Sequence, residues 1–361
     1  MKQMNFREEL SKYTPRLRNG YPGKIYIFGI GSEWEIIHEL YLNVLNVELT
    51  DHIFAFIDND PNKQGISYMS CPVIPPSKID NENAVVLIAS WKHHNEMATD
   101  LDKLGLICCS SFFYQEQFHW ILKRFIYSET AAFSNTVDGG RCFLIGNGPS
   151  LLVEDLEILH RNNEVSFGVN GITKIFEKTT WRPTFYFCSD VNVWCEIKND
   201  LEQLNCPQFF ASYFETENRF SKNVYYFDED QSTYFYNYPH CFKFSNNIEN
   251  IYRGGTVLYL VLQAAVSMGF NEIYLLGTDN KFPIEVLHDG TVVDHGNVLS
   301  HFYKGEISLK FYTTPIESML ASFAFARKYC EEHGIKIYNA TRGGALEVFD
   351  RVEFSNLFYN R

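Results

Sequence analysis

Residues 145–152, IGNGPSLL, form the pattern in this chain whose residue types and spacing point most directly to chemistry. Gly146 and Gly148 flank Asn147 after an apolar run, and Ser150 follows at the start of a predicted helix. A strand–turn–helix of this kind binds phosphate when glycines let the backbone approach and the helix start offers unpaired N–H groups. A tight turn with a purely structural role explains the short motif equally well.

Polar residues also follow other apolar runs in the same half of the chain. Because ligands of open α/β sheets bind at the carboxyl ends of the strands, we expect these residues to converge on one crevice. The segments YRGGTV (252–257) and NATRGG (339–344) each combine an arginine with glycines and a hydroxyl, and both are further candidate anion sites. The residues after the apolar runs are Asn170, Ser189, Asp190, Thr278 and Asp279, and those of the anion sites are Arg253, Gly254, Gly255, Thr256 and Arg342.

Three histidines, His288, His295 and His301, fall between residues 280 and 305. Their spacings fit neither a helical pair nor a ligand turn, so we predict no metal site there. His301 is a candidate general base, because an imidazole near its ordinary pKa removes a proton from a hydroxyl group at neutral pH.

The first third of the chain contains weaker motifs. FGIGSEWEI (28–36) has Glu35 near the place of the third glycine of a dinucleotide fingerprint. Asp58 and Asp60 form an Asp-x-Asp pair, which binds metal in many glycosyltransferases, but we favour the interpretation that they end a strand and begin a turn.

Apolar runs alternate with helical patterns twice along the chain, as in parallel α/β units. The polar segment 134–141 separates the two series. We therefore predict an α/β protein with two Rossmann-like domains and mainly parallel sheets, residues 1–135 and 136–361, the second being larger and carrying the active site. The predicted strands include 24–31, 52–60, 84–90, 164–171, 183–190, 271–279 and 335–340, and the predicted helices include 32–45, 112–128, 254–269 and 315–334.

Composition excludes several classes of function. The formal net charge is −13 and no large Lys/Arg cluster occurs, which argues against nucleic-acid binding and, more weakly, against broad attachment to anionic lipid. The nine cysteines are scattered without a CxxC pair, as in reduced cytoplasmic proteins. We expect no signal peptide, no transmembrane segment and a cytoplasmic location, and leave peripheral membrane association and oligomeric state open.

Tyrosine and phenylalanine are dense in residues 208–245. Their rings can stack on the faces of a sugar while staying partly solvated. A separately packed subdomain or lid accounts for the same composition.

Several of these motifs resemble a known family. FLIGNGPSL (143–151), a later arginine and the apolar helix leading into GFNEIYLLGTD (269–279) resemble the bacterial CMP-sialic acid-dependent sialyltransferases, and still more a broader group of bacterial surface-polysaccharide proteins. That group in turn resembles the motility accessory factors that glycosylate flagellin and the archaeal 6-hydroxymethylpterin diphosphokinases. SHFYKG (300–305) and residues 334–354 resemble the C-terminal signature of the polysaccharide group. The first domain resembles Rossmann-like modules of polysaccharide-synthesis enzymes.

The resemblance implies roles for residues at matching positions. It implies that His301 is the catalytic base, and that Asp190 and Ser189 lie near the donor sugar. The sialyltransferases place tyrosines soon after the residue that matches Asp279, whereas this chain reads NKFPIEVLHDG; Tyr303, Lys304 and Arg342 are candidate substitutes. By the same resemblance, the nucleotide is held by Gly146, Asn147, Gly148, Ser150 and Asn170, and its ribose or phosphate by Gly255 and Thr256.

These observations predict an inverting glycosyltransferase that needs no metal or other cofactor. It would transfer sialic acid or a related nonulosonate from a CMP-activated donor to a surface-glycan acceptor. His301 would activate the acceptor hydroxyl, and Arg253 with the backbone amides of 146–150 and 254–256 would stabilise the leaving phosphate. Two alternatives remain: a pyrophosphokinase-like enzyme in which Asp190 and Asp279 hold Mg²⁺ and ATP, and a non-catalytic nucleotide-binding partner in the same pathway.

Overall fold

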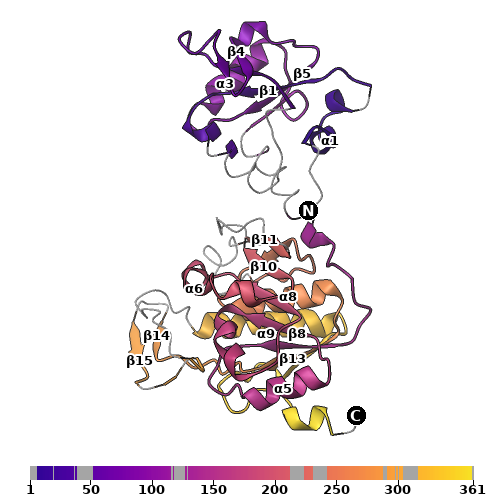
Figure 1. Ribbon diagram of the computed structural model, residues 1–361, viewed down its shortest axis with the longest axis vertical. Helices are drawn as coiled ribbons and strands as arrows, with labels where there is room; N and C mark the ends of the chain where they lie inside the picture. Colours follow the sequence, from indigo (N-terminus) through magenta and orange to yellow (C-terminus); the bar gives the residue numbers. More distant parts are fainter. Residues whose placement is uncertain are drawn as a thin grey trace. The chain divides into compact units, whose positions relative to one another are not determined.

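The computed structural model divides the chain into two compact units, the first within Met1–Ile126 and the second comprising Tyr127–Phe214 and Asn223–Arg361 (Figure 1). The second unit begins before the expected limit at residue 136 because the preceding segment packs on its sheet. Phe133 packs edge-on against Phe209 with ring centroids 5.0 Å apart, and Thr130 Oγ1 donates to Tyr226 O at 2.6 Å. The structure describes residues 6–18, 20–35, 37–38, 52–114, 117, 127, 129–211, 223–230, 242–287, 291–296, 298–299, 301–303 and 316–359.

The first unit is built on a sheet with strand order β3-β4-β2-β1-β5-β6. All neighbouring strands pair in parallel except β3 and β4. Both faces of the sheet are buried, as a parallel sheet requires. The elements are α1 (Phe6–Ser11), η1 (Pro15–Leu17), β1 (Lys24–Phe28), β2 (Ile53–Ile57), β3 (Ser67–Tyr68), β4 (Cys71–Ile74), η3 (Pro76–Lys78), β5 (Ala84–Ile88), α3 (His94–Lys103) and β6 (Phe112–Phe113).

The second unit contains a larger sheet of order β12-β11-β10-β9-β8-β7-β13-β16-β17, parallel throughout. The α/β fold with mainly parallel sheets is thus confirmed. The strands are β7 (Arg141–Ile145), β8 (Ser166–Val169), β9 (Phe185–Cys188), β10 (Gln208–Ala211), β11 (Val224–Asp230), β12 (Asn250–Tyr252), β13 (Glu272–Leu276), β16 (Lys336–Asn339) and β17 (Asp350–Arg351), and a separate hairpin is formed by β14 (Ile284–Val286) and β15 (Val292–Asp294).

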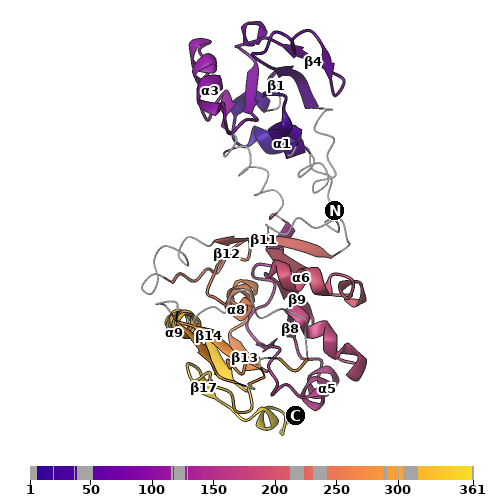
Figure 2. The same cartoon turned by 90° about the vertical axis from the view of Figure 1, so that its left-hand side faces the viewer.

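Successive strands are added to this sheet first on one side of β7 and then on the other. This change in the order of strands places helices on both faces of the sheet. From β7 the chain proceeds strand by strand to β12, and then returns through α8 to β13 on the other side of β7. Right-handed crossovers in the two directions put their helices on opposite faces, and Figure 2 shows α8 and α9 on one face with α5 and α6 on the other. The helical elements are α5 (Val153–Arg161), η4 (Asn170–Lys178), α6 (Val191–Ile197), η5 (Leu201–Gln203), α8 (Val257–Met268), α9 (Ile316–Glu332) and η6 (Phe354–Leu357).

This change in strand order makes the gap between the carboxyl ends of β7 and β13 the expected ligand position. Local sequence explains where α8, the helix that leads into β13, begins and ends. Thr256 caps α8 by accepting a hydrogen bond from Leu258 N, and Gly269 ends it in the left-handed region at φ 104°. The interior of α8 is apolar and buried, as its sequence predicts.

Two expectations about elements were wrong in part. Phe112 and Phe113, expected to begin a helix, form edge strand β6. The aromatic stretch, for which a sugar-binding surface and a lid or separate subdomain were both left open, supplies strands β10 and β11 of the main sheet, where the Phe187 and Phe209 rings stack at 4.5 Å. The remaining parts of the predicted helices 32–45 and 112–128, and residues 212–222 and 231–241, lie outside the described residues.

Neither a membrane-spanning helix nor a disulfide occurs in the described part of the chain. None of its helices combines the length and apolar composition that crossing a bilayer requires. Its eight cysteines are free thiols.

Candidate functional site

The glycine turn at 146–148 packs tightly against the end of β13. A Cβ placed on Gly146 would lie 2.5 Å from Gly277 O, and one on Gly148 would overlap the Asp279 carboxylate. Gly148 N also donates to Gly277 O at 2.8 Å. Neither turn glycine has a positive φ. Their function in this structure is therefore the close approach of two strand ends.

Ser150 binds a carboxylate of the protein itself. Its hydroxyl donates to Asp279 Oδ2 at 2.6 Å and its backbone N–H points to the same oxygen at 3.4 Å. Asp279 is only 7% exposed. The donors expected to hold a phosphate are thus used by Asp279, and a ligand phosphate at Ser150 would have to displace it.

Replacement of Gly148 by alanine tests this packing. Because the new methyl group would displace Asp279, we expect the variant to lose about 1–3 kcal/mol of stability. Denaturant unfolding measures the loss, with Gly31→Ala as the control, since a Cβ at Gly31 meets no atom within 4 Å. Equal stability of the two variants would contradict the packing described.

Buried polar atoms without hydrogen-bond partners occur in the segments that follow the neighbouring strands β8, β7 and β13. Five of the eight such atoms found among the described residues belong to segments that follow β7, β8 and β13. Each unpaired buried group costs about 1–3 kcal/mol unless water or a ligand pairs with it. The five atoms are Asn147 Oδ1, Asn170 Oδ1, Thr173 Oγ1, Thr278 Oγ1 and Asn280 Nδ2, and we call these residues the polar cluster.

Asn147 is the best-defined member of the polar cluster. It is 8% exposed, and its Nδ2 donates to Val169 O at 3.0 Å, which fixes the amide so that Oδ1 needs a donor. Asn170 and Asn280 adopt left-handed backbone conformations, with φ of 47° and 51°. Local strain of this kind gathers at functional sites.

His301 lies near the carboxyl end of β7, beside the turn that contains Asn147. Phe302 N donates to Asn147 O at 2.9 Å, and the Tyr303 hydroxyl lies where a Cβ on Gly171 would be. The rings of His301 and Tyr303 are 5.3 Å apart between centroids. The structure thus brings the expected base next to Asn147.

Burial sets the protonation of these two side chains. It lowers the pKa of His301 from 6.5, so the imidazole is neutral and able to accept a proton at pH 7. Burial also raises the pKa of Tyr303 to about 12, so its hydroxyl remains a hydrogen-bond donor.

The segment 253–256 connects β12 to α8 and ends in Thr256, which caps the helix. Arg253 Nε lies 3.7 Å from Glu229 Oε1, and Gly254 O accepts from Ser322 Oγ at 2.7 Å. Gly255 has φ 79°. In the sheet order β12 is five strand spacings from β7, roughly 24 Å at about 4.8 Å per spacing. A single phosphate group therefore does not contact both Arg253 and the 146–150 turn.

Asp190 and Ser189 follow β9 as expected. The exposed Asp190 caps α6, since its Oδ1 accepts from Asn192 N at 2.8 Å and from Val193 N at 3.3 Å. Ser189 is half-buried. Nearby, Tyr186 Oη donates to Asn170 O at 2.8 Å.

Within the described residues no group of three His, Cys, Asp or Glu side chains is arranged to hold a metal ion. His295 Nε2 lies 3.1 Å from Glu285 Oε2, across the β14–β15 hairpin. His288 and Lys304 lie outside the described part of the chain.

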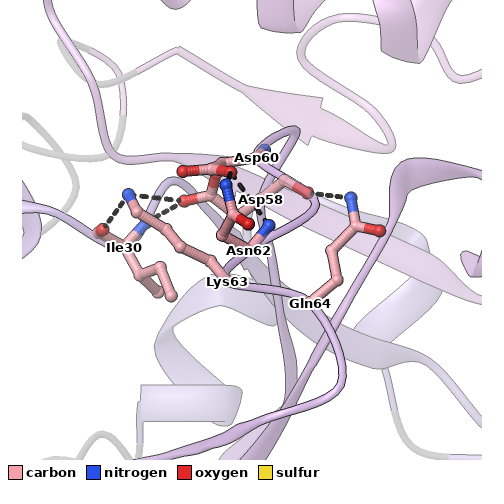
Figure 3. Close-up of polar contacts among 6 residues, drawn as sticks. All are labelled: Ile30, Asp58, Asp60, Asn62, Lys63 and Gln64. Atoms are coloured by element: carbon pink, nitrogen blue, oxygen red, sulfur yellow. Dashed lines mark hydrogen bonds and ion pairs between the residues drawn. The ribbon is translucent and has the colours of Figure 1, made fainter.

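The Asp58 carboxylate in the first unit accepts hydrogen bonds from nearby residues of the same unit. Figure 3 shows Lys63 reaching back so that its Nζ donates to Ile30 O at 2.9 Å and Asp58 Oδ2 at 3.2 Å. Asp60 N donates to Asp58 Oδ1 at 2.9 Å, and Asn62 N to Asp60 Oδ1 at 2.9 Å. These contacts are those of a strand end followed by a turn.

Comparison with known proteins gives one family match and one similar solved structure. The model of one family, described as 6-hydroxymethylpterin diphosphokinase MptE-like, matches residues 113–285. Residues 113–285 are thus similar to this family. The resemblance to the diphosphokinase-like proteins is therefore confirmed for this segment, which contains Asn147, Asn170 and Asp279. His301 and Arg342 lie beyond the MptE-like segment.

No curated protein matches the chain. Among solved structures, the MAf glycosyltransferase from Magnetospirillum magneticum AMB-1 aligns with 13% sequence identity and a TM-score of 0.39. The alignment covers 92% of this chain and 58% of that protein, so the chain spans less than two thirds of its length.

Two residues of the polar cluster, Thr173 and Asn280, have no counterpart among the expected site residues. Each lies within three residues of one that was expected, Asn170 or Asp279. Their proximity to predicted strand ends was the available signal. Their lack of partners becomes visible only in three dimensions.

Proposed function

We propose that the chain is a glycosyltransferase that transfers a sugar from a CMP-activated donor to a surface-glycan acceptor, the sugar being sialic acid or a related nonulosonate. The observation that carries the proposal is the polar cluster beside His301. Unpaired buried donors and acceptors next to a neutral imidazole suit a bound polar ligand and a proton transfer.

The chemistry of the polar cluster favours the nucleoside part of the donor. Its members are uncharged, and the nearby Ser150 donors already bind Asp279. Asn147 Oδ1 requires a hydrogen-bond donor, which the exocyclic amino group of cytosine supplies. Uracil has a carbonyl at that position and a ring donor only at N3, so the comparison of CMP with UDP in the screen below tests the choice of base.

In the proposed reaction His301 is the general base and Tyr303 stabilises the leaving group. His301 removes the proton of the acceptor hydroxyl, whose oxygen attacks the anomeric carbon while the bond to the CMP phosphate breaks, with inversion. Tyr303 keeps its proton because burial raises its pKa to about 12, so it can donate a hydrogen bond to the departing phosphate. No metal ion takes part in these steps.

A Mg²⁺-dependent pyrophosphokinase is the second candidate, and the match of residues 113–285 to the diphosphokinase-described family favours it. In that enzyme Asp190 and Asp279 would hold Mg²⁺ and ATP. Both carboxylates already accept hydrogen bonds, Asp279 from Ser150 and Asp190 from the start of α6. Mg²⁺ would have to draw them away from these donors.

The metal requirement distinguishes the two enzymes. We expect the wild-type protein to release CMP from CMP-sialic acid, with or without an acceptor glycan, at the same rate in EDTA as in Mg²⁺, because a few hydrogen-bond donors suffice for a phosphate monoester leaving group. Pyrophosphoryl transfer from ATP normally needs Mg²⁺. Transfer from ATP to a pterin alcohol, lost in EDTA and restored by Mg²⁺, would instead establish the pyrophosphokinase.

A further inference from the structure

The loop after β16 supports two residues that follow β13, Thr278 and Asp279. Thr278 N donates to Thr341 Oγ1 at 3.0 Å, and Ala345 N donates to Asp279 O at 2.7 Å. A Cβ on Gly344 would lie 3.0 Å from Asp279 O, so the loop and β13 are in close contact. Residues 341–345, which we call the support loop, therefore fix the backbone that carries Asp279.

The support loop is itself fixed by a buried asparagine. Thr341 N donates to Asn339 Oδ1 at 3.0 Å, and Asn339 Nδ2 donates to Leu346 O at 2.7 Å. Asn339 is 1% exposed and Thr341 4%. One end of the loop is thus anchored to β16.

Arg342 anchors the support loop to α5. Its two terminal nitrogens bind both oxygens of Asp155, with Nη2 2.8 Å from Oδ1. Asp155 is 1% exposed and lies in the first turn of α5, just after the turn that contains Ser150. A bidentate pair of this kind fixes orientation as well as distance.

These contacts form a closed ring. Ser150 binds the Asp279 side chain, Asp279 O binds the support loop, and Arg342 of that loop binds Asp155, five residues after Ser150. The polar cluster residues Asn147 and Thr278 lie on the two strand ends that this ring joins. Movement of Arg342 away from Asp155 would loosen both ends.

We propose that Arg342 is a positioning residue, which acts through Asp155 and Asp279 to hold the polar cluster in its ligand-binding arrangement. In this role its effect on a nucleotide is indirect, since it acts through the bidentate pair with Asp155. This inference rests on the proposed nucleotide site. It contrasts with a direct role in which the guanidinium itself binds the phosphate of the ligand.

The two roles predict opposite results for Asp155→Asn. If Arg342 bound the phosphate, loss of the Asp155 charge would free it, and CMP would bind with equal or higher affinity. If Arg342 positions the cluster, Asp155→Asn and Arg342→Gln both weaken CMP binding, by about 10- to 100-fold. The double variant should then lose little more than the weaker-binding single variant, because both substitutions break one interaction.

The experiment combines calorimetric CMP titration with amide hydrogen exchange on the full-length protein. We expect Thr278 and Ala345 amides to exchange at least about tenfold faster in Arg342→Gln and Asp155→Asn, with intermediate rates in Arg342→Lys. Arg327→Gln is the matched control, because Arg327 has a similar side-chain exposure and pairs with Glu331 on α9. It should leave both measurements unchanged.

Three outcomes would overturn the positioning role. These are unchanged exchange at Thr278 and Ala345, weaker CMP binding without faster exchange, and tighter binding in Asp155→Asn. If wild-type protein binds no CMP, the proposed nucleotide site fails, and the exchange rates alone then decide whether Arg342 holds the end of β13.

Discussion

Replacement of His301 by alanine is expected to lower kcat for sugar transfer by about 10²–10⁴-fold, the usual contribution of a general base. CMP affinity should change little, because the interaction that places this segment beside Asn147 is a backbone one, from Phe302 N to Asn147 O. Steady-state kinetics and CMP titration separate the two effects.

The pH profile provides a second measure of the same role. A base must be neutral to act, and burial lowers the pKa of His301 from 6.5. The wild-type kcat/KM should therefore persist below pH 6.5 and fall only at more acidic pH. His295→Ala is the control, since this exposed histidine pairs with Glu285 in the hairpin. A His301→Ala enzyme with unchanged kcat would exclude the proposed base.

Replacement of Asn147 by leucine is expected to weaken CMP binding by about 5- to 150-fold, equivalent to about 1–3 kcal/mol for the partner left unpaired. The free protein should remain folded, because leucine has a similar shape and removes an acceptor that has no partner. The one hydrogen bond lost is that to Val169 O.

The first unit offers a matched control for Asn147. Asn81 Nδ2 donates to Leu104 O at 2.9 Å and its Oδ1 is likewise buried without a partner. Asn81→Leu should leave CMP binding unchanged. Equal affinities of Asn147→Leu and wild type would show that CMP does not contact the polar cluster.

Elements with a strong local pattern could be predicted from the sequence. The apolar run that forms β13 and the capped helix α8 were expected because their signals are continuous and their ends carry Thr256 and Gly269. Strands β10 and β11 were missed because aromatic residues are equally suited to a strand, a lid or a sugar-binding surface. Their pairing with neighbouring strands of the parallel sheet decided among these alternatives.

The sequence predicted which residues belong to the candidate site better than it predicted the contacts that these residues make. The strand-end rule identified Asn147, Asn170 and Asp279, and the structure brings the segments that carry them to one edge of the sheet. It could not reveal that the turn binds Asp279, because Ser150 and Asp279 are 129 residues apart in the sequence. The pairing of Arg342 with Asp155 was hidden for the same reason.

The central claim, that the polar cluster binds a cytidine nucleotide, is tested most directly by a thermal-shift screen of the full-length protein against CMP, CDP, UDP, GDP and ATP. Ligands stabilise the folded state by mass action, by about 2.7 kcal/mol at a hundred times their Kd. We predict the largest rise in Tm with CMP, present in Asn81→Leu and absent in Asn147→Leu. A larger rise with ATP, or a CMP-induced rise that Asn147→Leu retains, would contradict the account.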